Sequence, residues 1–300
     1  MNLAESIHKI EPFANNLAFR VWSVSNKNPF SELSRFNYFT LVLWKKGIVE
    51  VKADVSVYQV KEQSVLFFSP YQPFQFTTLH EEEIELSVIN FHPDFFCILK
   101  HQKEVSCNGV LFNNLYEPPF VSLTDEQAIP LLILLEQMHN ELKQDALAQH
   151  DLLLSYLKIF LIHTTRYKAL AQDNAGVQME QLPERDILQQ LKKAIEQDFV
   201  KEHSPSYYAE KLHISPKALG KLSKKHFNRT LSELIQERLM MEAKRELYLT
   251  DKSVKEIAYA LGFEDEYYFS RLFKKNTDTS PIQYRKTVGE DQARKLKIEY

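Results

Sequence analysis

The chain has 300 residues, of which 44% are hydrophobic and 26% charged, and its formal net charge is -3. This length allows two domains of ordinary size, and this composition excludes wholesale disorder. The longest apolar runs, IPLLILL and IFLI, are too short to span a bilayer, and the N-terminus lacks the features of a signal peptide. We therefore expect a cytoplasmic protein with no membrane partner.

The charge is distributed unevenly along the chain. Residues 183–288 hold 20 Lys and Arg against 16 Asp and Glu, whereas residues 1–182 hold 14 against 21. A basic C-terminal block attached to an acidic N-terminal block is typical of a nucleic-acid-binding domain joined to a domain that does not bind nucleic acid. Chance segregation of solvated charge would give the same asymmetry, so the charge difference alone does not establish nucleic-acid binding.

Residues from about 18 to 115 are rich in aromatic and β-branched residues in short runs. YFTLVLWKKGIVEVKADVSVYQVKEQSVLFFS predicts three strands separated by turns, PYQPFQF predicts a turn before another strand, and EIELSVINF predicts a further strand. Short strands at regular spacing favour an antiparallel barrel or sandwich.

The pattern then changes to helix. Thr124 and Gln127 have the spacing of a capping box, and Pro130 should kink this helix or delay its start. A second helix, over about residues 146–169, is apolar on several faces, so we expect residues 152–161 to pack against a partner subunit as well as the sheet. The polar stretch QDNAGVQMEQLPE is the expected linker.

The remainder of the chain contains an internal repeat of helices. YAEKLHISPKALGKLSKKHF aligns with IAYALGFEDEYYFSRLFKK, so that His213 takes the place of Gly262. Each copy has a helix that must end in a left-handed residue, followed by a capped second helix, as in a helix-turn-helix unit. Ser215 is the expected cap in the first copy, and Glu264 or Asp265 in the second.

The segment RLMMEAKRELYLTDKSVKEIAYALGFEDEYYFSRLFKKNTDTSPIQYRK, residues 238–286, resembles the AraC/XylS family of bacterial transcription regulators. With a weaker match over residues 204–238, the resemblance covers about the last third of the chain. It implies a DNA-binding domain over residues 185–288, followed by a polar tail over 289–300. Its recognition helices, at about 215–227 and 265–275, would enter successive segments of the major groove.

The resemblance also assigns DNA-facing residues. Arg271 suits a bidentate contact to guanine and Glu266 suits acceptance from cytosine, whereas Gly220 offers no side chain to read a base. Lysine and arginine side chains farther along each helix suit phosphate contacts. The positions implied to face bases are Lys217, Gly220, Lys221, Glu266, Tyr267, Ser270 and Arg271, and those expected to contact phosphates are Lys224, Lys225, Lys274, Lys275 and Arg285.

The strand-rich region is similar to the cupin-like barrel that this family often carries, with INFHPDFF, residues 89–96, resembling its end. This implies a regulatory domain over residues 1–120, a helical dimerisation segment over 121–171 and a linker over 172–184. Aromatic residues of a small barrel are usually core, and the sequence leaves open whether a small-molecule effector binds. The residues that would line its pocket are Phe36, Tyr38, Trp44, Phe68, Phe74 and Phe76.

We therefore predict an α+β multidomain protein, with an antiparallel β cupin-like barrel and trailing helices before an all-α double helix-turn-helix domain. The predicted function is a homodimeric, sequence-specific transcription regulator that binds double-stranded DNA, with RNA polymerase left open as a further partner. The family resemblance suggests an activator, but the sequence leaves the choice between activator and repressor open. The alternative is a cupin-type enzyme with a helical accessory domain. Enzymatic cupins hold a metal through an HxH pair, a Glu and a later His, but His80, His92 and His101 lie at no ligand spacing. We expect no metal, no cofactor and no catalysis.

Overall fold

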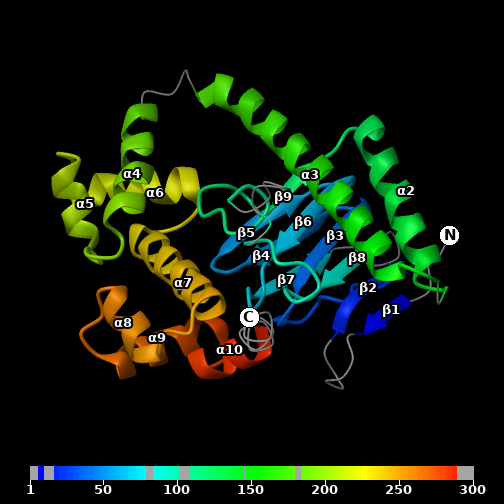
Figure 1. Ribbon diagram of the computed structural model, residues 1–300. Helices are drawn as coiled ribbons and strands as arrows, with labels where there is room; N and C mark the ends of the chain where they lie inside the picture. Colours follow the sequence, from blue (N-terminus) through cyan, green and yellow to red (C-terminus); the bar gives the residue numbers. More distant parts are fainter. Residues whose placement is uncertain are drawn as a thin grey trace. The chain divides into compact units, whose positions relative to one another are not determined.

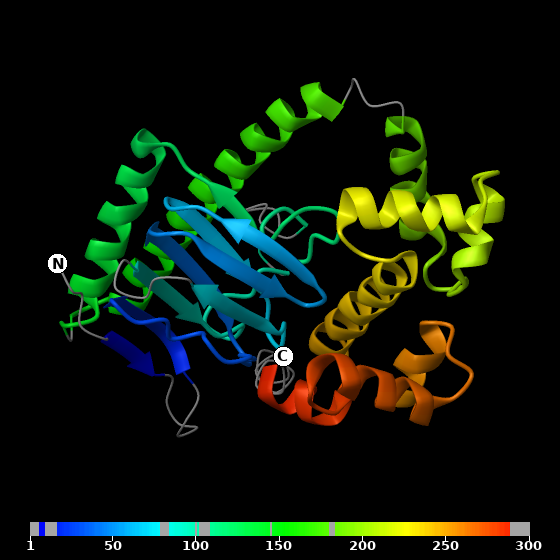
Figure 2. The same cartoon turned by 180° about the vertical axis from the view of Figure 1, so that it is seen from behind.

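The protein consists of two compact units in the computed structural model (Figure 1), which describes residues 6–9, 17–78, 84–99, 101, 109–144, 146–179 and 184–288. The first unit comprises Met1–Asn114 and Pro118–Gln172, and the second comprises Leu115–Glu117 and Asp173–Tyr300. Strands and two long helices form the first unit, whereas the described part of the second is helical (Figures 1 and 2). The expected α+β class is confirmed.

The first unit contains two antiparallel sheets. One has six strands in the order β1-β2-β8-β3-β6-β9, and the other has three in the order β5-β4-β7. The six are β1 (Ser6–Lys9), β2 (Leu17–Ser25), β8 (Glu85–Phe91), β3 (Phe39–Lys46), β6 (Ser64–Phe68) and β9 (Phe120–Ser122), and the three are β5 (Ser56–Val60), β4 (Val49–Ala53) and β7 (Phe74–Thr78). The strands predicted from the short apolar runs therefore form, and they pair with a register that places Phe91 opposite Phe19 on one side and Phe39 on the other.

Alternating side chains give the six-stranded sheet two apolar faces. On one face, Leu41, Phe67 and Ile89 pack with the buried side of two helices, α2 (Asp125–Glu141) and α3 (Gln149–Met179). On the other face, Val42 and Val88 belong to a second core that includes residues of the three-stranded sheet. The period of two along each strand therefore supplies both cores of this unit.

Helix α2 begins where its capping box places it. The Thr124 hydroxyl accepts from the Gln127 N–H, and the Gln127 side chain accepts from the Thr124 N–H. The helix starts at Asp125 and includes Pro130, so the expectation that Pro130 delays the start is wrong. The capping box satisfies free N–H groups upstream, and the proline removes only one intrahelical bond after the helix has begun.

Helix α3 is longer than the predicted one. It runs to Met179, well into the stretch expected as a linker over 172–184, and the strong helix breaker of that stretch, Pro183, comes only four residues after its end. Leu153, Leu157 and Leu161 are buried in the core of their own unit, so these three side chains do not face a partner subunit. Residues 180–183 of the linker and the expected tail, 289–300, lie outside the described residues.

Four of the six aromatics expected to line an effector pocket are fully buried core residues. Phe68 and Phe74 stack with ring centroids 4.0 Å apart, and Trp44 meets Phe76 edge-on at 5.8 Å. Phe36 and Tyr38 differ, because they stack on each other while partly exposed. Burial raises the pKa of the Tyr38 hydroxyl to about 12, although the charge of Arg20 opposes the shift.

The second unit contains the helical repeat. Helix α7 (Leu231–Leu249) joins the pair α5 (Pro205–Lys211) and α6 (Pro216–Phe227) to the pair α8 (Val254–Ala260) and α9 (Glu266–Thr277). Helix α4 (Arg185–Asp198) precedes the first pair, and α10 (Pro281–Val288) follows the second. The capping box at Thr230 and Glu233 starts α7 as its spacing predicts.

Replacing Phe74 by alanine tests the assignment of this ring to the core. We expect Phe74→Ala to lower the free energy of unfolding by about 3–5 kcal/mol, because a fully buried aromatic ring leaves a cavity. Denaturant titration of the full-length protein measures the change, with Ile48→Ala in an exposed turn as the control. A loss below about 1 kcal/mol would return Phe74 to the candidates for a pocket.

Candidate nucleic-acid interface

The two helical pairs share one turn geometry. The Ile214 N–H donates to the Ala209 carbonyl oxygen at 3.0 Å, and the Phe263 N–H donates to the Ala258 carbonyl oxygen at 3.0 Å. The residue before each donor is left-handed, with φ of 53° at His213 and 78° at Gly262. The repeat predicted from the sequence therefore forms two helix-turn-helix units, α5–α6 and α8–α9.

Each second helix has the N-cap that its sequence predicts. The Ser215 hydroxyl accepts from the Ala218 N–H at 3.3 Å at the start of α6. Of the two acids open as caps for α9, Asp265 takes the role, and its carboxylate accepts from the Tyr267 N–H at 2.8 Å. The negative charge at the start of α9 thus has a structural function, because it satisfies a free backbone donor and complements the helix dipole.

The apolar faces of α6 and α9 hold them in their units. Phe269 and Phe273 of α9 are fully buried, as is Leu219 of α6. At the place of Phe273, α6 carries Ser223, which is also buried and donates to the Arg229 carbonyl oxygen at 2.7 Å. In the first helix-turn-helix unit, a buried serine with a hydrogen bond therefore takes the place of an aromatic ring. The sequence pattern did not predict this contact.

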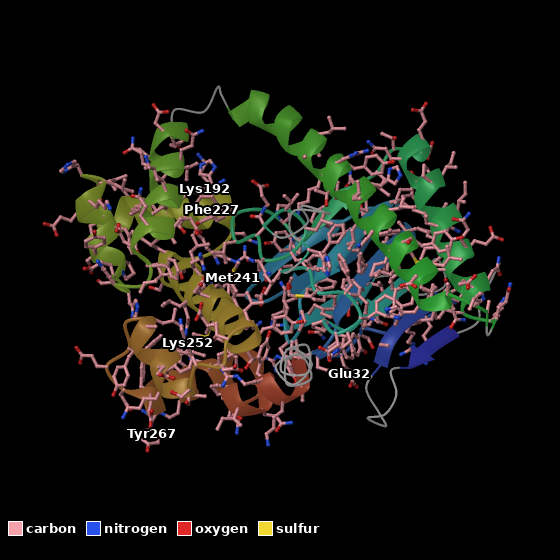
Figure 3. The ribbon with its side chains drawn as sticks, in the orientation of Figure 1. Glu32, Lys192, Phe227, Met241, Lys252 and Tyr267 are labelled. Carbon is pink, nitrogen blue, oxygen red and sulfur yellow. The ribbon has the colours of Figure 1, made fainter. Side chains whose placement is uncertain are left out.

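The residues expected to face bases lie on the outer sides of the two helices. Lys217, Lys221 and Arg271 are exposed, and Tyr267, which is 68% exposed, points away from the helices around it (Figure 3). The other three, Gly220, Glu266 and Ser270, are partly exposed. Apart from its chain neighbours and the backbone of its own helix, no atom lies within 4 Å of the position that a Cβ on Gly220 would take, so this residue leaves the α6 surface open for close approach.

The residues expected to contact phosphates divide into two kinds. Lys224, Lys274 and Lys275 are exposed at the ends of the helices, and Lys225, also exposed, pairs with Glu184 at 3.1 Å. The hydrogen bond from Lys225 lowers the pKa of Glu184. Arg285 instead donates from Nε to the Leu247 carbonyl oxygen and from Nη2 to the Lys252 carbonyl oxygen, at 3.1 and 2.6 Å. These two bonds favour a role in fixing α10 to the end of α7.

Ion pairs run along α7 and connect it to its neighbours. Arg238 lies 2.9 Å from Glu196 of α4 and 3.1 Å from Glu242. Arg245 continues the series by pairing with Glu242 at 2.7 Å. Burial opposes the ionisation of Glu242, but hydrogen bonds from Arg245 and Arg238 outweigh it and lower the pKa of this carboxyl group.

The described residues contain no group of three or more His, Cys, Asp or Glu side chains arranged to hold a metal ion. His92 is buried and pairs with Asp94 in the turn after β8, with Nδ1 and Oδ2 3.2 Å apart. No helix in the described part of the chain is long and apolar enough to span a membrane.

Two helix-turn-helix units in one compact unit, each with exposed polar and basic side chains on its second helix, define a double helix-turn-helix DNA-binding domain. Residues 208–287 match the family described as a helix-turn-helix domain. Through this stretch, the chain carries a C-terminal helix-turn-helix domain of the AraC/XylS type.

Several curated proteins and solved structures are similar to this chain. The uncharacterized HTH-type transcriptional regulator YijO of Escherichia coli K12 is 41% identical over 78 residues, 26% of this chain and 28% of that protein. The transcriptional activator RhaS of Enterobacter sp. 638 is 28% identical over 162 residues, 54% of each chain. The solved C-terminal domain of the response regulator yesN from Fusobacterium nucleatum is 32% identical, with 33% of this chain and 98% of that one covered at a TM-score of 0.33. The chain spans from about a quarter to half the length of the two curated relatives.

The ion pairs of Glu242 make stability depend on pH. The pKa of Glu242 is lowered in the folded state from its usual 4.5, so its ionised form stabilises the fold above that value and the gain is lost as pH falls through the folded pKa. We expect Glu242→Gln to be less stable than wild type at pH 7 and to converge with it in acid. Denaturant titrations across pH 7 to pH 3 test this, with exposed Glu210→Gln as the control at pH 7. A constant difference across that range would contradict it.

Proposed function

We propose that the protein is a sequence-specific transcription regulator that inserts α6 and α9 into successive major-groove segments. The observation that carries the proposal is the pair of helix-turn-helix units in one compact unit, each with an outward second helix bearing exposed Lys or Arg. Helix α7 has 19 residues and is therefore about 28 Å long. Such a spacer is comparable with the distance of about 34 Å between major-groove segments one turn apart.

The chemistry of α9 suits base reading. The Arg271 side chain is 72% exposed and its Nη2 lies 4.0 Å from the Asp265 carboxylate, so the guanidinium is held near the start of the helix and open to a guanine. Glu266 follows Asp265 and is partly exposed, and it has the acceptor that cytosine N4 requires. Asp265 therefore caps the helix while Glu266 takes part in reading.

Helix α6 has a different role in this proposal. Lys217 and Lys221 supply charge, and Gly220 lets the backbone between them approach the groove edge. Lys224, Lys225, Lys274 and Lys275 position the domain by contacting phosphates without specifying sequence. The second helix-turn-helix unit, α8–α9, therefore contributes more of the base discrimination than the first, α5–α6.

The N-terminal unit would regulate the DNA-binding unit. Phe36 and Tyr38 are the two of the six expected pocket aromatics that are partly exposed, and they are the residues we propose for effector contact. We propose that the protein acts as an activator in the cytoplasm, with RNA polymerase as its further partner and without catalysis, metal or cofactor.

We propose that the protein is a homodimer through α2 and α3. Ile129, Leu132 and Ile133 follow an i, i+3, i+4 pattern on α2 and are exposed, although the opposite face of α2 is in the core. Leu152 and Ile159 are exposed on α3. An apolar stripe at helical spacing favours contact with the same stripe on a second copy, as in a two-fold interface.

Selection of bound sequences from random duplex DNA, at two salt concentrations, tests the proposed function of the full-length protein. A recovered motif with two parts about one helical turn apart is the expected outcome. A motif with one part would assign reading to one unit alone. Binding that fades with salt and enriches no sequence would mean non-specific electrostatics and would refute sequence-specific regulation.

Replacing Arg271 by alanine separates base reading from phosphate contact. We expect Arg271→Ala to relax the preference at one base pair at a cost of about 1–3 kcal/mol on the selected site. Lys275→Ala is the control, because a phosphate contact should weaken binding equally on all sequences and reduce the salt dependence by about one unit of slope. Equal weakening of all sequences by Arg271→Ala would reassign this residue to the backbone.

A charge on the α2 stripe tests the dimer. We expect Ile133→Asp to give a monomer by sedimentation at micromolar concentration, because a carboxylate buried in an apolar interface is strongly unfavourable. Val57→Asp, at an exposed position on β5, should leave the dimer intact. A wild-type protein that sediments as a monomer would refute the interface.

A further inference from the structure

Residues 199–203, between α4 and α5, form a loop that contacts the turn of the second helix-turn-helix unit. The Lys201 and Glu202 N–H groups both donate to the Asp198 carbonyl oxygen at 2.9 Å, which closes the loop on the end of α4. The hydroxyl of the fully buried Tyr208 donates to the Glu202 carbonyl oxygen at 2.8 Å. The loop is therefore fixed to the first helix-turn-helix unit, and α5 begins only two residues after the loop.

The same loop is fixed to α7. The Arg238 guanidinium carbon lies 3.9 Å from the centroid of the Phe199 ring, and Phe199 is almost fully buried. The Arg238 Nε also donates to Glu196 at 2.9 Å, so this side chain holds the end of α4 and the start of the loop together. A stacked and paired arginine has little freedom to move.

The loop is attached, thirdly, to the second helix-turn-helix unit, α8–α9. His203 Nε2 lies 3.1 Å from the Leu261 carbonyl oxygen, and a carbonyl can only accept, so the imidazole donates. The His203 ring also packs on Phe263, with centroids 5.1 Å apart. Leu261 and Phe263 flank the left-handed Gly262, so the loop holds the turn that sets the direction of α9.

Gly262 has a second reason to be glycine. A Cβ at this position would overlap the Val200 carbonyl oxygen and would lie 3.4 Å from His203 Nε2. The first helix-turn-helix unit has His213 at the equivalent turn, with the same left-handed backbone. The left-handed position therefore accepts the His213 side chain in the first helix-turn-helix unit. In the second, the loop lies too close to Gly262 for any side chain.

We infer that His203 is a positioning residue that sets the spacing at which the protein reads its two half-sites, without touching DNA. This inference rests on the proposed function, since it requires both α6 and α9 to read. Helix α7 joins the two helix-turn-helix units covalently, and Arg285 bonds α10, which follows the second, to the carbonyl oxygens of Leu247 and Lys252 at the end of α7. The contacts of residues 199–203 join the first helix-turn-helix unit to the turn of the second at a separate place, which restrains α9 further against rotation relative to α6.

A second attachment changes what the protein tolerates in its DNA site. Inserting one base pair between half-sites moves the second by about 3.4 Å and rotates it by about 35°. A protein with restrained units cannot follow that displacement, so it loses the contacts of one unit. A protein with only the α7 connection could follow it at a small cost. Specificity for spacing would thus come from residues remote from the bases.

The test measures affinity for the selected site, for sites with one base pair inserted or deleted, and for DNA carrying only the part read by α9. Full-length wild type, His203→Ala, His203→Gln and Lys201→Ala are compared. Wild type should lose about tenfold or more on either spacing change. His203→Ala should lose much less, and His203→Gln, whose amide can donate to the Leu261 carbonyl, should restore the wild-type penalty.

The controls make the outcomes distinct. Lys201→Ala, an exposed change in the same loop, should keep the wild-type penalty, and equal binding of every variant to the α9 part alone would show that its unit is folded. Wild type that tolerates both spacings, or His203→Ala that keeps the full penalty, would overturn the inference and leave the proposed function intact. A selected site with only one part would instead remove the two-unit reading on which both depend.

Discussion

The DNA-binding unit depends on one backbone hydrogen bond made twice. In each pair, the chain leaves the first helix through a left-handed residue, and the next N–H returns to the carbonyl of a buried alanine, Ala209 or Ala258. A small side chain is needed there because the second helix crosses close to the first. The turn sets the orientation of α6 and α9, and therefore the direction in which their exposed side chains point.

The two units solve the same packing problem with different chemistry. Helix α9 buries Phe273 against Tyr284 of α10, with ring centroids 5.5 Å apart. Helix α6 buries Ser223 at the equivalent place and satisfies it with a carbonyl oxygen, as a buried hydroxyl requires. An aromatic contact holds α9 and a hydrogen bond holds α6 at the equivalent place. The exposed faces of the two helices can therefore differ in sequence while the helices keep equivalent positions.

Much of this architecture was predictable because its signals are local. Alternating strands, the capping boxes at Thr124 and Thr230, and the left-handed Gly262 each follow from a few neighbouring residues. The errors arose where the outcome depended on distant contacts or on weak signals. The polar stretch after residue 171 contains no proline before Pro183, and α3 continues to Met179. Arg285 stays a predicted phosphate contact, but the sequence did not show that its guanidinium bonds two carbonyl oxygens from segments far away in the sequence. The contact between residues 199–203 and the turn at Gly262 has no sequence signal at all.

The acids at the start of α9 have a consequence for how the protein finds its site. Under the proposed function, Glu264, Asp265 and Glu266 bring negative charge to the end of the helix that would approach the phosphates, so they would weaken attraction to every DNA sequence alike. A cytosine that paired with Glu266 would compensate for that repulsion at the correct site only. The acids would therefore lower binding to competing DNA more than binding to the target. Fewer molecules would then be retained on the large excess of competing sites, and the search for the target would be shorter.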